Sequence, residues 1–127
     1  MKDTNIEVLK KMDWNTLVHE YDLDGKRLLP WEGVNMPFGG AWCVIRKGTD
    51  SFKHNHEENE IFICISGKAT IVIDGNKYDM TKGDMITIPC NSSHYVNNPF
   101  EEDFHMYSIW WDKESTTSYL KMITSDE

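Results

Sequence analysis

The chain has 127 residues, with 13 Lys and Arg against 21 Asp and Glu, and a formal net charge of −8. This length suits a single domain, and the acidic balance argues against nucleic acid or an anionic membrane surface as a partner. No apolar stretch approaches the length of a membrane span, and the polar N-terminus lacks the apolar core of a signal peptide.

The first third of the chain is predicted to be an arm with little regular structure. Ile6, Leu9, Lys10 and Asp13 are spaced by three and four, which would permit a short helix over residues 6–14. Residues 22–40 contain Asp24-Gly25, Pro30 and several further Gly and Pro residues, which predict loops. We therefore expect residues 1–40 to form an arm that packs on the domain that follows.

Short strand-like segments follow in quick succession. They are predicted over residues 41–46, 52–56, 61–66, 69–74, 77–80, 85–88, 94–96 and 104–111. Asp74-Gly75 marks a hairpin turn, and no internal repeat is present. Short strands separated by Gly, Asn and Asp turns predict an all-β sandwich or barrel. We expect one jelly-roll β-barrel over residues 41–112 and a C-terminal tail over 113–127.

Three cysteines, Cys43, Cys64 and Cys90, are odd in number and irregularly spaced. This pattern suggests neither a disulfide framework nor a zinc knuckle. A reducing cytoplasm is therefore the expected location.

Three histidines and a glutamate have spacings that one metal ion would explain. His54 and His56 alternate, so in an extended strand their side chains share a face. Glu60 follows a short turn, and His94 must come from a different strand. A histidine pair alone would more often lie on the surface, but three imidazoles and a carboxylate make a half-open cage for a divalent transition metal.

The residues around these four resemble the two motifs of the cupin superfamily. The segment GTDSFKHNHEENEIFICISG fits the first motif, G(X)5HXH(X)3,4E(X)6G, at every fixed position. The segment GDMITIPCNSSHYVNN fits the second, G(X)5PXG(X)2H(X)3N, except that Asn91 replaces the inner glycine. Asn tolerates a left-handed turn well. The resemblance implies a small single-domain cupin in which His54, His56, Glu60 and His94 bind one divalent ion: zinc, iron, manganese or nickel.

Strand alternation from Glu60 predicts what lines the pocket. If Glu60 faces the lumen, Phe62 and Cys64 face it too. The isoleucines at 61, 63 and 65 then face outward, where they would need the N-terminal arm or a second subunit to cover them. Small cupins are commonly dimers, so a homodimer is expected.

Further pocket and proton-carrying residues come from the aromatic and histidine content of the strands. Trp42 and Trp110 are expected to line the pocket, although aromatic residues at such positions would ordinarily fill a core. Tyr95, Tyr107 and His105 are candidate proton carriers, against the commoner alternative that they are structural or exposed.

A metal with open positions can polarise a carbonyl, activate water or, as iron, bind dioxygen. The sequence therefore predicts a metal-dependent enzyme acting on a small polar metabolite, with oxygenase, isomerase or lyase chemistry. The alternative is a non-catalytic cupin that binds or senses a small ligand.

The segment 106–112 resembles a subgroup of cupins associated with methionyl-tRNA-synthetase-like domains. That resemblance implies formation of a nitrogen–nitrogen bond by rearrangement of a hydroxylamine-linked amino-acid conjugate on a bound metal, often zinc. Such a role would require a synthetase-like partner protein.

Overall fold

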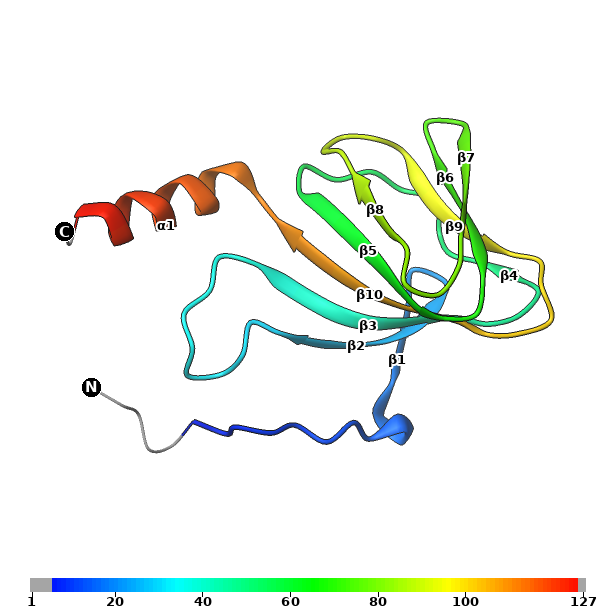
Figure 1. Ribbon diagram of the computed structural model, residues 1–127, viewed down its shortest axis with the longest axis horizontal. Coiled ribbons are helices and arrows are strands. Elements are labelled where there is room, and N and C mark those ends of the chain that lie inside the picture. Colours follow the sequence, from blue (N-terminus) through cyan, green and yellow to red (C-terminus); the bar gives the residue numbers. More distant parts are fainter. Residues whose placement is uncertain (1–5, 126–127) are drawn as a thin grey trace.

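Two antiparallel sheets make up most of the computed structural model, which describes residues 6–125 (Figure 1). The six-stranded sheet has, in spatial order, β1 (Val18–Glu20), β2 (Leu23–Leu29), β3 (Gly39–Ile45), β10 (Phe104–Trp111), β5 (Asn59–Ser66) and β8 (Met85–Ile88). The four-stranded sheet has β4 (Thr49–Asp50), β9 (His94–Asn98), β6 (Ala69–Ile73) and β7 (Asn76–Met80). This arrangement confirms the predicted all-β jelly roll.

The core lies between the inner faces of the two sheets. Alternation along each strand sends every second side chain inward, as along β10, where Phe104, Met106 and Ser108 are buried and the residues between them are only partly buried. Ile45, Ile71, Phe104 and Met106 are each 2% exposed or less and belong to one apolar cluster. Burial of such side chains supplies the main favourable free energy of the fold.

The N-terminal segment differs from the prediction. Residues 6–13 form no helix; a 3₁₀ turn, η1 (Trp14–Thr16), begins after Asp13, whose side chain accepts a hydrogen bond from the Asn15 N–H at 3.0 Å. Residues 22–40 are not all loop, because β2 pairs with β3 along its length. Gly25 was misread as a turn residue.

Close packing explains the glycine at position 25. A Cβ added there would lie 3.0 Å from the carbonyl oxygen of Trp42 on β3. The turn lies earlier, at Tyr21 and Asp22, whose φ angles of 54° and 56° are those of a type I′ hairpin between β1 and β2.

The residues after β10 form a helix, α1 (Lys113–Ser125), which leads away from the two sheets (Figure 1). Asp112 caps its first turn, because its carboxylate accepts hydrogen bonds from the Ser115 N–H at 2.6 Å and the Ser115 hydroxyl at 2.9 Å. Throughout residues 6–125, no helix combines the length and the apolarity that crossing a bilayer requires.

Candidate metal centre

Three imidazoles meet at one end of the space between the sheets. The candidate ligand atoms of His54, His56 and His94 all lie within 4.8 Å of one another. The rings of His54 and His94 are 4.6 Å apart between centroids, and those of His56 and His94 are 4.9 Å apart. The structure thus brings together the three histidines that the sequence singled out.

Main-chain hydrogen bonds hold these histidines in place. His54 and His94 form an isolated antiparallel bridge, so β9 and the segment before β5 are joined at the site itself. The Asn91 N–H donates to the carbonyl oxygen of His56 at 2.7 Å. Asn91 has a φ of 63°, which explains why Asn can stand at the motif's glycine position.

Each histidine also has its Nδ1 atom engaged by a main-chain carbonyl two residues away. The distances are 2.9 Å from His54 to Phe52, 2.9 Å from His56 to Glu58 and 3.0 Å from His94 to Ser92. A carbonyl can only accept, so each Nδ1 carries the proton. The Nε2 lone pairs of His54 and His94 are left for a ligand, as in metal-binding histidines. Nε2 of His56 donates to Oε1 of Glu60 at 3.1 Å, a proton that a bound metal ion would replace.

Glu60 lies beside this cluster, with its side chain only 12% exposed. Its Oε1 is 3.1 Å from Nε2 of His56 and 3.5 Å from Nε2 of His94, and Ser108 donates a hydrogen bond to Oε2. Burial alone would raise the pKa of Glu60, but its contacts with His56, His94 and Ser108 outweigh burial and hold the pKa at about 2. Glu60 is therefore a carboxylate at neutral pH.

The electrostatics of the histidines follow from the same contacts. The hydrogen bond with Glu60 raises the pKa of His56, whereas burial lowers the pKa of His54. Nε2 of His94 is buried and has no hydrogen-bond partner among the described residues. A buried imidazole nitrogen left without a partner is costly, so a divalent ion bound there fits the donor set.

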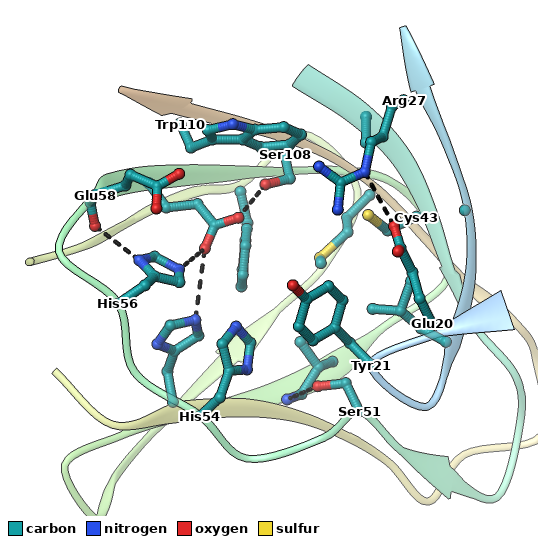
Figure 2. A pocket seen from close by; sticks show the side chains of 18 of the residues that line it. Glu20, Tyr21, Arg27, Cys43, Ser51, His54, His56, Glu58, Ser108 and Trp110 are labelled. Atoms are coloured by element: carbon teal, nitrogen blue, oxygen red, sulfur yellow. Dashed lines mark hydrogen bonds and ion pairs between the residues drawn. The ribbon is translucent and has the colours of Figure 1, made fainter. Parts of the chain in front are cut away.

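A cavity of about 350 Å³ opens from the histidines (Figure 2). Its walls include apolar side chains such as Phe62, Val96 and Met106, and its rim carries Tyr21 and Arg27. Tyr21 stacks on the ring of His54, with centroids 5.0 Å apart and planes inclined by 25°. The cavity therefore combines a polar metal-binding end with apolar walls.

The predicted pocket residues divide into two groups. Phe62 and Trp110 line the cavity. Cys64 is buried in the core instead, with Sγ 3.6 Å from the Gly67 carbonyl oxygen. Trp42 lies on the other face of β3, where its Nε1 donates to Nδ1 of His105 at 2.9 Å.

The three predicted proton carriers also lie away from the cavity. His94 faces inward on β9, so Tyr95, its neighbour, faces outward. Ser108 and Trp110 face inward on β10, so His105 and Tyr107 face outward, next to Trp42. Because none of the three is among the residues lining the cavity, we do not place them in the site.

Among the cavity residues that did not emerge from the sequence are Tyr21, Arg27, Cys43 and Ser108. Burial raises the pKa of Cys43 to about 12, so its thiol stays protonated. Alternation back from Trp110 would have found Ser108. Arg27 was missed because residues 22–40 were read as loop. Tyr21 was missed because no strand or hairpin was predicted in the segment just before them.

Comparison with known proteins identifies the architecture. Residues 41–110 match the family described as "Cupin domain". The structure superposes on the plu4264 protein of Photorhabdus luminescens with a TM-score of 0.85 and 56% identity, over 94% of this chain and 99% of the other. A Cupin 2 conserved barrel domain protein from Salinispora arenicola gives a TM-score of 0.83 and 37% identity, over 93% and 99%.

Two curated relatives carry names of activities. An acireductone dioxygenase from Acidiphilium cryptum is 32% identical over 79 residues, which are 59% of this chain and 42% of the relative. The "H2HPP isomerase" of Bacillus subtilis is 27% identical over 99 residues, which are 78% of this chain and 36% of the relative. The chain thus spans less than half the length of either protein.

Proposed function

The chain belongs to the cupin family, and we propose that it is a metal-dependent enzyme acting on a small polar metabolite. The observation that carries this proposal is the set of three imidazoles that lie together at the end of an open cavity, each held by a hydrogen bond from Nδ1 to a main-chain carbonyl. A dioxygenase and an isomerase among the relatives support catalysis over passive binding.

His54, His56, His94 and Glu60 would hold one divalent ion. Three nitrogens and one carboxylate suit zinc, iron, manganese or nickel. When bound, the ion would supply Lewis-acid or redox activation of a substrate oxygen. That range covers the oxygenase, isomerase and lyase chemistry expected from the sequence.

The surrounding residues have separate tasks in this proposal. Ser108 fixes Glu60 by a hydrogen bond to Oε2, and Tyr21 packs flat on His54. Apolar walls such as Phe62 and Met106 exclude water, which strengthens electrostatic interactions with a bound substrate.

We also propose that the protein forms a homodimer through the outer face of the six-stranded sheet. Ile61, Ile63 and Ile65 are each half-buried there, so neither the arm nor any other described segment covers them fully. Trp14 from the arm covers only a neighbouring part of this face, packing edge-on against Trp42 with centroids 5.5 Å apart. A second copy would bury the remainder.

Two expectations stay predictions. A cytoplasmic location rests on the cysteine pattern alone. The rearrangement that forms a nitrogen–nitrogen bond rests on the resemblance of residues 106–112.

The proposal is tested by metal content and turnover together. Protein purified without a histidine tag should contain about one equivalent of a transition metal by elemental analysis. Candidate metabolites are then compared between the wild type and Glu60→Ala at matched metal loading, with the exposed Glu101→Ala as control. Turnover should fall at least about a hundredfold in Glu60→Ala. Undiminished turnover in Glu60→Ala, or in a variant that holds no metal, would rule out metal catalysis. Tight binding of a metabolite without turnover would favour the alternative, a non-catalytic cupin that binds or senses a small ligand.

A further inference from the structure

We infer that the substrate carries a carboxylate, which Arg27 binds at the cavity rim while another oxygen group of the substrate reaches the metal. This inference rests on the proposed function, because it needs the ion at the opposite end of the cavity. The substrate would therefore be a small molecule with two oxygen-donor ends, one of them anionic.

Arg27 faces the cavity because of its register on β2. It lies opposite Ala41 of β3, and both residues line the cavity. Figure 2 shows the guanidinium between Trp110 and Tyr21, across the cavity from the histidines. Its side chain is 58% exposed and already pairs through Nε with Glu20, so a ligand in the cavity can reach the remaining donors of the guanidinium.

Neighbouring groups hold the guanidinium in place. Nε of Arg27 donates to Oε1 of Glu20 at 3.1 Å, and the guanidinium lies over the indole of Trp110, 5.7 Å from its centroid. The indole in turn rests on Gly39, where an added Cβ would come within 2.5 Å of it. The hydrogen bond with Glu20 raises the pKa of Arg27, so the side chain stays a cation.

This arrangement leaves the Nη atoms in the position that a ligand would use. Glu20 engages Nε, and Figure 2 shows the Nη atoms directed into the cavity. A guanidinium presents its donors as a rigid planar fork that matches the two oxygens of a carboxylate. Because the fork is already oriented, less rotamer entropy is lost when the carboxylate binds.

Arg27 also stands at the junction of two hollows. A second hollow of about 570 Å³ lies beyond the first, and the two share Arg27, Glu58 and Trp110. An anion in either hollow can therefore contact Arg27. The carboxylates of Glu20 and Glu58 on the same rim would disfavour ligands whose negative charge cannot reach the guanidinium.

The experiment compares acids that differ only at the end assigned to Arg27. Malonate, succinate and glutarate, together with their monoamides, are titrated by calorimetry into zinc-loaded protein. Each monoamide has a single carboxylate, which a divalent ion binds more strongly than an amide oxygen, so the amide is the end left for Arg27. Binding to the cobalt-substituted protein, followed by its visible absorption, reports separately on the metal end.

The wild type should bind at least one of these diacids roughly tenfold to a hundredfold more tightly than its monoamide, the difference expected for a hydrogen-bonded charge. Arg27→Gln should abolish that preference and leave monoamide affinity and zinc content unchanged. Arg27→Lys should retain part of the preference, because it keeps the charge but loses the fork. Arg46→Gln is the matched control, since Arg46 pairs with Asp24 and Asp103 and does not line the cavity.

A preference that survives in Arg27→Gln, or that is missing for all three diacids in the zinc-loaded wild type, would overturn the inference and leave the metal enzyme standing. A wild type that retains no metal would instead overturn the proposed function, and this inference with it.

Discussion

His54 and His94 are hydrogen-bonded to each other through their main chains. The His54 N–H donates to the His94 carbonyl oxygen at 3.2 Å, and the His94 N–H donates to the His54 carbonyl oxygen at 2.9 Å. The two strands that carry metal-binding candidates are thus joined by the fold itself rather than by an ion. Such a site is largely formed before the metal arrives, so its ligands need little rearrangement on binding.

Replacing His56 by Ala should abolish stoichiometric metal binding without unfolding the protein, because the apolar core holds the sheets together. Elemental analysis and circular dichroism check the two halves of this expectation. Adding zinc at about 100 times its Kd should stabilise the wild type by about 2.7 kcal/mol, and raise its Tm by roughly 10 °C. His56→Ala should show little of this rise. Loss of the fold on chelation would contradict the prediction.

Gly67 and Gly75 both lie in turns, and comparing them tests why the first cupin motif ends in glycine. Gly67, its last glycine, has a φ of 80°, and a Cβ there would lie 2.5 Å from the carbonyl oxygen of Asp103. Gly75 has a φ of 85° with no heavy atom within 4 Å of a Cβ. Gly75→Ala should cost about 1–2 kcal/mol of unfolding free energy, and Gly67→Ala more than about 3 kcal/mol. Urea titrations giving equal losses would refute the steric account.

Acid should remove the contribution of the ion pairs around Arg46. Hydrogen bonds with His19 and, to a smaller extent, with Arg46 lower the pKa of Asp24. The pKa of Asp103 is lowered mainly by a hydrogen bond from the Lys47 N–H, and Arg46 lowers it further. Since both pKa values are lower in the folded state, the contribution is present above the unfolded pKa of about 3.9 and is lost as pH falls through the folded values.

Arg46→Gln should therefore destabilise the protein at pH 7 by up to about 1 kcal/mol per exposed pair. This difference from the wild type should shrink as pH falls below about 4. Urea unfolding at several pH values measures it, with Lys77→Gln on β7 as a control for the loss of one positive charge. A difference that grows on acidification would have the wrong sign.

The proposed dimer predicts a change of assembly on one face of the molecule. Ile63→Lys places a charge in the centre of the outer face of the six-stranded sheet and should give a monomer by light scattering. Tyr78→Lys, at an exposed position on the other sheet, should leave the dimer intact. A wild type that is monomeric at high concentration would remove the dimer from the proposal.

Sequence reasoning was most reliable where spacing and chemistry coincide. His54, His56 and His94 could be placed together because motif spacing and strand alternation agree on a common centre. Alternation from Glu60 put Phe62 in the cavity, but it could not show that Cys64, two residues further along β5, lies beyond the cavity's end.

The residues that face outward were predicted to lie in the site for a different reason. Aromatic residues on both faces of a strand look alike in sequence, so only the inward His94 could have shown that Tyr95 faces outward. Strand β2 was missed because Asp24-Gly25 has the composition of a turn, whereas close contact with β3 is what requires that glycine. Tertiary packing determines both which face of a strand an aromatic residue occupies and why position 25 is glycine. Local propensity carries no information about such packing.

Tyr21 has a left-handed backbone conformation, with a φ of 54°, that aromatic residues rarely adopt. An aromatic side chain in the left-handed region costs free energy, on the order of 1 kcal/mol, that glycine or asparagine at the same hairpin position would avoid. The main-chain oxygen of Tyr21 accepts a hydrogen bond from the Phe52 N–H at 2.7 Å, which ties the turn to the segment bearing His54. Stability and activity therefore make opposite demands on this position. Replacing Tyr21 by glycine or asparagine would stabilise the hairpin but would remove the aromatic ring from the cavity rim.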